Sequence, residues 1–437
     1  MALAAYCRTS SRLACDSLVA LHHATADGTV LFAKNSDRPA SESQPLLQQP
    51  RRSHAAGTRL RCTHIEIPQV AETARVIGSR PFWCWGFEHG LNEHGVAVGN
   101  HTVFSRDPLA AVGLIGMDLV RLGLERSRTA EHAVEIMTAL IEKHGQGGSG
   151  YGDTDWPYHN SFLVADRQTA YALETSDRQW ATRRIEAVGS LSNHLTIGAD
   201  WDALSDGAIE HALDAGWWSE ARDERFSFAE AYRDTSVVPE AISSGRHRRT
   251  CELLDHHRGN ISVGSLKCTL RDHYGRPTPS TDLTPADEQY FSVCMHAEPV
   301  GTTTASMIAR IPADVDEPLT YWASFGSPCV GAFIPLYVDG EIPMVLTGGG
   351  AQASDASLWW QFKHLQTMVE RDWTRCGPPV RQALDHFEAE ITEHMRSARI
   401  ATQTVRARTT FMHATVDDLV ERLRQLSRKE MWESPRG

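Results

Sequence analysis

The chain has 437 residues, of which 41% are hydrophobic and 22% charged, with 32 glycines and 20 prolines. This is ordinary globular usage, and it excludes a collagen, a low-complexity chain and a fully disordered one. The 43 basic and 55 acidic residues give a net charge of −12, and no block of lysine and arginine interrupts the sequence. We therefore expect no nucleic-acid partner and no anionic membrane partner, because nonspecific binding to either depends on clustered positive charge.

No run of the sequence reaches the roughly 18 apolar residues needed to cross a bilayer, so no membrane partner is expected. The apolar stretch at residues 2–6 is too short for an export signal, and Arg8 and Arg12 follow it instead of preceding it. The nine cysteines are scattered and odd in number, in a chain too long to need disulfides. We expect reduced cysteines and a cytoplasmic location.

The first elements have the pattern of a β-hairpin. Two runs of β-favouring residues, 15–22 and 29–35, flank Ala26-Asp27-Gly28, and Asp-Gly between such runs is the strongest short hairpin signal. Further strands are predicted at residues 60–67, 74–79 and 95–104, the last after a turn at 92–95. Apolar residues then recur every three or four positions, which predicts helices at 116–126 and 129–144, the second capped by Thr129 and followed by Gly145.

The second half of the chain alternates strands and helices. The glycine-rich segment 145–150 matches the GxGxxG pattern but follows a helix instead of a strand, so it indicates a connector and not a dinucleotide site. Strands are predicted at 161–166, 169–174 and 179–185, a helical section at about 201–267, and strands at 302–311, 319–325 and 333–338. The glycines at 348–350 mark the expected domain boundary before a helical tail at 355–433. This order predicts an α+β fold with helices on antiparallel sheets.

Most motifs of known chemistry are absent. The sequence has no P-loop, HExxH, GxSxG or paired CxxC motif, so nucleotide-binding, zincin, serine-hydrolase and zinc-ribbon interpretations lose their support. The pairs Cys84 with His89 and His94 with His101 lack a standard zinc-ligand spacing. Packed or surface histidines are the better interpretation, and we expect no metal and no organic cofactor.

The remaining chemistry gathers around Cys15, at the start of the first predicted strand. A cysteine there is more often a small buried hydrophobic residue than a nucleophile. However, the hairpin that follows ends in KNSDR at residues 34–38, which is more charge than an inert strand requires. Asn100 and Asn193 also interrupt otherwise apolar strand sequences, so these polar groups are candidates for a site.

The sequence resembles the secernin and dipeptidase family of cysteine N-terminal-nucleophile (Ntn) hydrolases, and the secernins most closely. The matching stretches run in order from residue 15 to about 311 and comprise CDSLVAL, FAKNSDR, WGFEHGLNEHGVAVGN, GMDLVRLGLERS, TAEHAVEIM, HNSFLVAD, ALETSDRQWA, LSNHLTI, SSGRHR and TTTASMIARIP. The resemblance implies an αββα four-layer sandwich whose first strand carries the nucleophile at its amino end. It implies a leader at 1–14, an Ntn-hydrolase domain at 15–350 and a helical C-terminal extension at 351–437.

Removal of the leader, by Cys15 itself or by another agent, is part of this expectation. Methionine removal alone cannot expose residue 15, so a cleavage must precede activity. Cys15 would then carry both a thiol and an α-amine, whose reference pKa is about 7.7–8.0. An amine of that pKa can serve as the general base for the thiol beside it at neutral pH.

The resemblance assigns roles to further residues. Asp37 would accept a hydrogen bond from the amine and hold it, and Lys34 occupies the position where related bile-salt and penicillin acylases carry an arginine that favours the thiolate. Asn100 and Asn193 match the asparagines that serve the oxyanion hole and position the amine. Arg246 matches a late arginine of the site. Turn, cap and solvated-surface roles are the structural alternatives for all five.

Other residues of the shared motifs have no assigned role or depart from the family pattern. Glu88, Asn92 and Glu93 lie in the motif at 85–100 without an assignable function. Lys34 lacks the planar fork of an arginine, which weakens the expectation of bidentate contact to a substrate carboxylate. His101 stands where relatives often have an acid.

The expected function is hydrolysis of a small amide or dipeptide through a thioester on Cys15, so a small peptide or amide is the expected substrate. Two alternatives stay open: a non-hydrolytic binding or trafficking protein of the same fold, and an acyltransferase that uses the same thioester. The tail is expected to pack on the core or on a second copy in a homo-oligomer, with Trp359, Trp360 and Leu365 as its apolar contacts.

Overall fold

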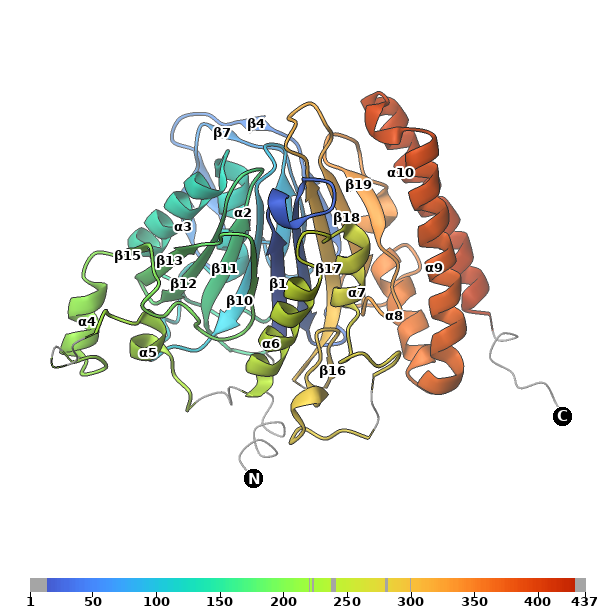
Figure 1. The fold of residues 1–437 in the computed structure, drawn as a ribbon. Coiled ribbons are helices and arrows are strands. Elements are labelled where there is room, and N and C mark those ends of the chain that lie inside the picture. The colour runs from blue at the N-terminus through green and yellow to red at the C-terminus, as the bar shows by residue number, and fades with distance from the viewer. Residues whose placement is uncertain are drawn as a thin grey trace.

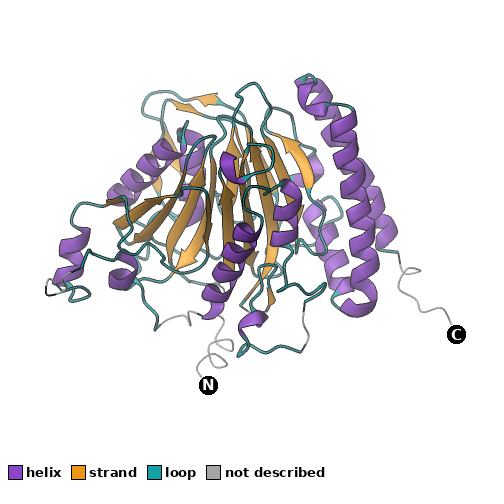
Figure 2. Ribbon diagram, in the orientation of Figure 1, coloured by secondary structure: helices purple, strands orange, loops and turns teal. Residues whose placement is uncertain are grey.

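Two antiparallel sheets lie face to face at the centre of the molecule, with helices on their outer sides (Figure 1, Figure 2). The structure is a computed structural model that describes residues 14–219, 221, 224–236, 241–279, 282–298 and 300–428, without the side chains of residues 14 and 241. The predicted leader therefore lies almost wholly outside the described residues.

The first sheet has seven strands in the order β14-β1-β2-β17-β18-β19, with β16 paired to β17. Its strands are β1 (Ala14–Ala20), β2 (Val30–Arg38), β14 (Val188–Leu191), β16 (His296–Ala297), β17 (Gly301–Ile311), β18 (Thr320–Phe325) and β19 (Ile334–Tyr337). The predicted hairpin forms its centre, since β1 pairs antiparallel with β2. Gly28 in the connection has a φ of +71°, a left-handed conformation that favours glycine.

The second sheet has eight strands in the order β15-β13-β12-β11-β10-β9-β8-β3. Its strands are β3 (Leu46–Gln49), β8 (Val76–Ser79), β9 (His89–Asn92), β10 (Ala97–Val103), β11 (His159–Ala165), β12 (Ala170–Ser176), β13 (Gln179–Arg184) and β15 (Ala203–Leu204). Two small ribbons lie beside it: β4 (Arg52–Ser53) with β7 (Glu72–Thr73), and β5 (Arg59–Arg61) with β6 (Glu66–Pro68).

Helices cover the outer face of each sheet. On the second sheet, α2 (Gly116–Arg126) packs against β9 and β10, and α3 (Ala130–His144) packs against β11 and β12. On the first sheet, α6 (Ala241–His256) packs against β1 and β14, and α7 (Val263–Leu270) packs against β2 and β17. The short helices α4 (Ala208–Asp214) and α5 (Phe228–Tyr232) lie between these groups along the chain. The expected αββα sandwich is therefore confirmed.

The alternation of side chains on β1 and β2 divides the core between two faces. Val19 and Phe32 belong to the apolar cluster between the sheets, together with Leu163 of β11. Leu18 and Ala33 belong to a second cluster on the helix-covered face. Both faces of the central hairpin are thus buried, because successive side chains of a strand point to opposite sides. The polar residues on β1 and β2 are consequently buried as well.

Most predicted elements are confirmed, including the Thr129 cap of α3, which accepts a hydrogen bond from the main-chain N–H of His132. The single strand predicted at 60–67 is wrong. The main-chain N–H of Cys62 donates to the Ile65 carbonyl at 2.9 Å, which folds the segment into the β5–β6 hairpin. In its described residues, the helical section at 201–267 consists of the helices α4 to α7 with connectors between them. The strands β3 and β9 were not predicted.

Three helices form the C-terminal tail beside β18 and β19, at the right in Figure 1. They are α8 (Leu358–Val369), α9 (Trp373–Ser397) and α10 (Val405–Leu426). α8 packs against β18 and α10 packs against β19, so the tail extends the core of the first sheet. Trp359 and Leu365 are fully buried there, as expected, whereas Trp360 is half-buried.

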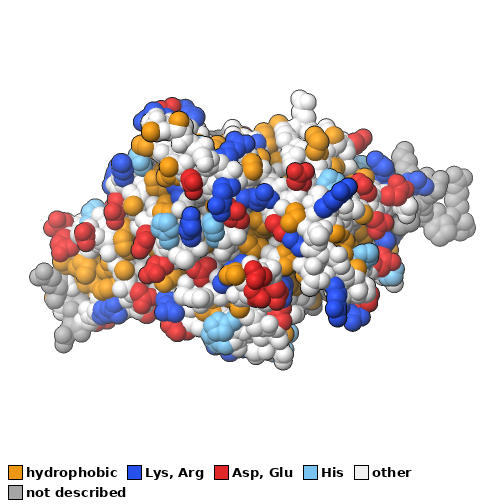
Figure 3. All heavy atoms as spheres, turned by 90° about the horizontal axis from the view of Figure 1, so that it is seen from above, with side chains coloured by type: hydrophobic (Ala, Val, Ile, Leu, Met, Phe, Trp, Pro, Cys, Tyr) orange, Lys and Arg blue, Asp and Glu red, His pale blue; other side chains and the backbone are white. Residues whose placement is uncertain are grey.

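The charged surface is mixed. Figure 3 shows acidic and basic side chains interspersed over the face seen from above. Within the described ranges, we find no helix that combines the length and the apolar character needed to span a membrane.

We expect Trp359→Ala to destabilise the fold by about 3–5 kcal/mol, the usual cost of truncating a buried aromatic side chain. The indole also donates from Nε1 to the Thr304 carbonyl on β17 at 2.8 Å, so the tail and the central sheet lose a direct bond. The half-buried Trp360→Ala is the matched control and should lose less. Urea unfolding of both variants measures the difference, and equal losses would contradict the assignment of the tail to the core.

Candidate active site

The strand register places the candidate residues on two different faces of the first sheet. Cys15 lies opposite Ser36, and Ser17 lies opposite Lys34. Since paired residues share a face and alternate residues share a side, the side chains of Cys15 and Lys34 point between the two sheets. Asp16 and Asp37 point to the opposite side, toward α6.

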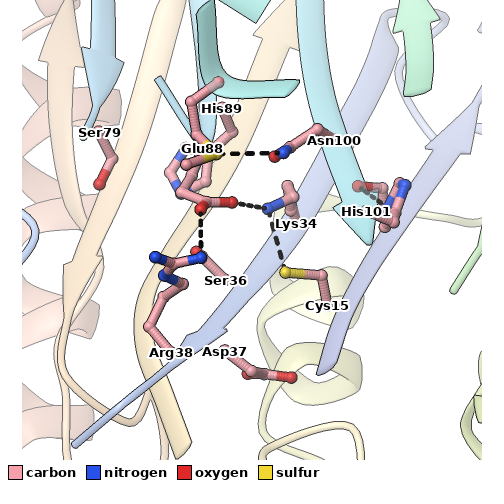
Figure 4. A network of polar contacts seen from close by, with 12 residues as sticks. Cys15, Lys34, Ser36, Asp37, Arg38, Ser79, Glu88, His89, Asn100 and His101 are labelled. Carbon is pink, nitrogen blue, oxygen red and sulfur yellow. Dashed lines mark hydrogen bonds and ion pairs between the residues drawn. The ribbon is translucent and has the colours of Figure 1, made fainter. Parts of the chain in front are cut away.

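Between the sheets, Lys34 joins the thiol to a carboxylate (Figure 4). Its Nζ lies 3.6 Å from Cys15 Sγ and 3.3 Å from Glu88 Oε2, and the side chain is fully buried. Room for this side chain comes from Gly99 on β10, where a Cβ atom would lie 2.6 Å from Lys34 Cδ. Gly99 is thus a packing requirement of the lysine.

A second cation completes this network. Arg38 Nη1 lies 3.5 Å from Glu88 Oε1, and its Nε donates to Glu42 Oε1 at 2.6 Å. The guanidinium also lies over the Tyr151 ring, 4.2 Å from the ring centre. Two cations therefore alternate with two carboxylates, which offsets the cost of burying each charge.

Asn100 belongs to the same network through Glu88. With its amide nitrogen directed at Glu88, it donates to the main-chain oxygen at 3.0 Å and to Oε2 at 2.9 Å. The opposite orientation offers that nitrogen only contacts of 3.6 Å with Met117 Sδ and 3.5 Å with Asn160 Oδ1. The hydrogen-bond network thus favours the orientation toward Glu88. In this orientation both amide hydrogens have partners on Glu88.

On the helix-covered face, Arg246 of α6 is the central cation. Its Nη1 donates to Asp16 Oδ2 at 2.6 Å, and its Nη2 donates to Asn193 Oδ1 at 2.7 Å. Its Nε donates to the Ile242 carbonyl one turn earlier in α6. The side chain is fully buried, so this arginine is a structural part of the site and not a solvated charge.

Asn193 connects Arg246 to the main chain of the nucleophile. Its Oδ1 accepts the bond from Arg246 and also accepts the main-chain N–H of Cys15 at 2.8 Å. Its Nδ2 donates to the Thr102 carbonyl at 3.0 Å, which fixes the amide orientation. The nitrogen of residue 15 therefore has a defined acceptor.

Asp37 has one satisfied oxygen and one that is not. Oδ1 accepts a bond from Thr303 Oγ1 at 2.6 Å. Oδ2 lies 4.0 Å from Arg246 Nη1 and has no hydrogen-bond partner among the described residues. Burial raises the pKa of Asp37 to about 7, and the neighbouring Asp16 adds to the rise while Arg246 opposes it. One arginine thus serves two carboxyls, and Asp16 has the closer contact.

The buried surroundings of Cys15 disfavour the charged thiolate form of its side chain. Burial raises the pKa of Cys15 to about 11, although the charge of Lys34 acts in the opposite direction. The expected influence of Lys34 therefore has the predicted sign but is smaller than desolvation. At neutral pH the thiol of the intact chain is protonated.

The structure brings together all six residues singled out in the sequence: Cys15, Lys34, Asp37, Asn100, Asn193 and Arg246. Sequence reasoning missed the roles of Glu88, Asp16 and Thr303, because each role depends on a partner far away in the chain. The motif at 85–100 offered Glu88 and Glu93 as acids, but nothing in the sequence assigned Glu88 to Lys34. His101 is buried, bonds to Ser17 Oγ at 2.8 Å, and has its pKa lowered well below the usual range by burial.

No residue of this site belongs to a group of metal-ligating side chains. Among the described residues, the one such group consists of His273, Cys294, His296 and Cys329. The pairs weighed in the sequence, Cys84 with His89 and His94 with His101, are not part of it.

Two helix-covered antiparallel sheets, with Cys15 near the start of the central strand β1 of the first sheet, form the fold that was expected for this chain, and the family match makes it a cysteine-type hydrolase. A model of peptidase family C69 matches residues 14–237 and 218–386, so the chain belongs to peptidase family C69. The expected family is confirmed, and the closer likeness to secernins stays a prediction.

Several known proteins are similar to this chain. Two proteins described as probable dipeptidase A, from two serotypes of Streptococcus pyogenes, are 21% and 22% identical, and the matches cover 82% and 75% of each chain. A penicillin V acylase from Agrobacterium tumefaciens has a TM-score of 0.41 at 13% identity, covering 74% of this chain and 86% of that chain. A variant of the conjugated bile acid hydrolase from Clostridium perfringens has a TM-score of 0.43 at 14% identity, covering 76% and 95%.

The raised pKa of Asp37 predicts a pH-dependent stability of the unprocessed chain. Between the ordinary value of 3.8 and about 7, the folded chain keeps a proton that the unfolded chain has released. The stability from this proton is present below the unfolded pKa and is lost as the pH rises through the folded pKa.

The test compares Cys15→Ala, confirmed by mass to be unprocessed, with Cys15→Ala/Asp37→Asn. We expect the free energy of unfolding of the first chain, relative to the second, to fall between about pH 4 and pH 8. Urea unfolding at several pH values measures this difference. Parallel pH profiles for the two chains would contradict the raised pKa.

Proposed function

We propose that this chain is a dipeptidase or small-amide hydrolase that acts through a thioester on Cys15 after residues 1–14 have been removed. The thiol sulfur attacks the amide carbonyl, the proton of the thiol passes to the α-amine of Cys15, and the amine leaving group takes that proton as the C–N bond breaks. Water then attacks the thioester, and the thiol is released with the acid product. No cofactor takes part in this scheme.

The observation that carries the proposal is the position of the Cys15 nitrogen. Cleavage before residue 15 turns a peptide N–H into a free amine on the same residue as the thiol. The acceptor for that nitrogen is already present, since Asn193 Oδ1 lies 2.8 Å away and is itself fixed by Arg246. An amine held in this way has its lone pair available for one proton transfer to and from the sulfur.

The pKa of the thiol supports the need for a base. In the intact chain, burial raises the pKa of Cys15 to about 11, so the thiolate is scarce at neutral pH. An amine with a reference pKa of about 7.7–8.0 is neutral for a substantial part of the time near pH 7.5. It can accept the thiol proton during attack, and a preformed thiolate is not needed.

Asp37 provides the electrostatic partner of the protonated amine. Asp37 Oδ2 has no hydrogen-bond partner among the described residues, and we assign it as the acceptor for the ammonium that forms when the thiol proton arrives. A new cation near Asp37 would also draw its pKa back from about 7 toward the ordinary range. Lys34 and Asn100 then act from the other face through Glu88, by fixing the charge beside the sulfur.

The class of substrate rests on the relatives. The proteins from Streptococcus pyogenes are described as probable dipeptidases, which supports small peptides as substrates of this chain. A cytoplasmic location and a homo-oligomer remain part of the proposal, as does the release of the leader by Cys15 itself.

We expect the active protein to begin at Cys15, as measured by intact-mass spectrometry and by release of amino acids from a panel of dipeptides. Cys15→Ala should lower the hydrolysis rate by roughly a thousandfold or more, because both the nucleophile and the thioester are lost. Cys62→Ala, at another buried cysteine, is the matched control and should keep both the processing and the rate.

Three results would contradict the proposal. They are full activity with Met1 still in place, full activity in Cys15→Ala, and a correctly folded chain that keeps its leader and turns over no amide. The last result favours the binding-protein alternative. Transfer of the acyl group to added hydroxylamine faster than to water would instead identify an acyltransferase that uses the same thioester.

A further inference from the structure

A second cluster of reactive side chains lies outside the site around Cys15. His273, Cys294, His296 and Cys329 each offer one nitrogen or sulfur atom, and these four atoms lie within 4.8 Å of one another. They come from three segments: the turn after α7, strand β16 with the residues before it, and the loop between β18 and β19. All eight cysteines among the described residues are free, so no disulfide accounts for the cluster there.

We propose that His273, Cys294, His296 and Cys329 bind a structural zinc ion as a Cys₂His₂ site. Two thiolates and two imidazoles are a common donor set for tetrahedral zinc. At zinc–sulfur and zinc–nitrogen distances of about 2.3 and 2.0 Å, tetrahedral geometry sets the donors about 3.3–3.8 Å apart. As zinc binds, each thiol releases its proton to solvent and its sulfur becomes a ligand.

His296 already has the required separation from both sulfurs. Its Nε2 lies 3.4 Å from Cys294 Sγ and 3.3 Å from Cys329 Sγ. The four donor atoms lie within 4.8 Å of one another, so a small inward movement of His273 would complete the tetrahedron. His296 and Cys329 are half-buried, which leaves the ion a way in from solvent.

His273 supplies the independent observation. It is 4% exposed, and neither of its ring nitrogens has a hydrogen-bond partner among the described residues. A buried imidazole without any partner is costly. His273 lies close to two cysteines and a histidine. A metal ion bound to one of its ring nitrogens would explain why that nitrogen has no hydrogen-bond partner.

The other ring nitrogen of His296 has a carboxylate near it. His296 Nδ1 lies 4.0 Å from Glu370 Oε1, and that oxygen accepts a bond from Gln366 Nε2 at 2.7 Å. Metal-binding histidines commonly direct their second nitrogen to a carboxylate, which orients the ring. α8, through Gln366, would thereby help to position a ligand that lies on β16.

The ion would stabilise the segment that holds Asp37. Met295 lies between Cys294 and His296. Its carbonyl accepts the main-chain N–H of Thr303 at 3.1 Å, and its own N–H donates to Thr303 Oγ1 at 2.8 Å. The same hydroxyl donates to Asp37 Oδ1. Asn35 also binds this region, since its Nδ2 donates to the Val293 carbonyl at 2.8 Å. Zinc would thus join three separate segments directly behind the carboxylate of the candidate active site.

The first test is metal analysis of the full-length protein purified from medium with zinc and without chelators. We expect about one zinc per chain, and less than about a tenth of that in Cys294→Ser/Cys329→Ser. Cys376→Ser, at a buried cysteine outside the cluster, should keep its zinc, and so should Cys15→Ala. Retention in Cys15→Ala separates this proposal from the proposed hydrolase chemistry.

A second measurement does not depend on the folding of the double variant. The wild-type protein, stripped with a chelator and loaded with Co²⁺, should show thiolate-to-cobalt charge-transfer absorption and the visible bands of a tetrahedral site. Glu370→Gln should weaken zinc binding by about tenfold, measured by competition with a chromophoric chelator, while Glu421→Gln should leave it unchanged.

Two outcomes would overturn the zinc site. One is wild-type protein that contains no zinc, takes up no Co²⁺ and keeps its melting temperature in the presence of a chelator. The other is peptide mapping that finds Cys294 and Cys329 joined as a disulfide in the active protein.

Discussion

The hydrogen bond between the Asn193 side-chain oxygen and the main-chain nitrogen of Cys15 is the contact around which the site is organised. That oxygen also accepts a bond from Arg246, whose other nitrogen binds Asp16. The main-chain nitrogen of Cys15 in β1 is thereby held at one point in space by α6 and by the segment after β14. The chemistry proposed here needs this fixed position, because an amine that acts as a base must reach the sulfur of its own residue.

Burial imposes a second constraint on the charges of the site. Both faces of the central hairpin are covered, so every ion on it requires a partner. Between the sheets, Lys34 and Arg38 share Glu88, and Glu42 pairs with Arg38. On the helix-covered face one arginine serves two carboxyls, and Asp37 keeps an unsatisfied oxygen and a raised pKa. This imbalance leaves room for one more positive charge, which an amine at Cys15 would supply.

Local sequence signals predict an element correctly when the residues that begin, turn or end it lie within the element itself. The hairpin at 15–35 has its Asp-Gly turn, and α3 has its Thr129 cap and terminal Gly145, so each was predicted near its observed bounds. The strands β9 and β14 are four residues long and lack such signals. They exist because β9 pairs with β8 and β10, and because β14 completes the edge beside β1. Pairing over long sequence separations is decided by the whole fold.

The amino-acid sequence by itself determined the α+β class, the central hairpin and, through family motifs, the six residues of the candidate site. It did so because hydrophobic period, turn residues and motif spacing are local properties. Only the tertiary structure decided that Glu88 joins Lys34 to Arg38, that Asp37 and Cys15 point to opposite faces, and that four ligating side chains converge near Thr303. These are contacts between residues tens to hundreds of positions apart, and the packing of two sheets and their helices brings them together.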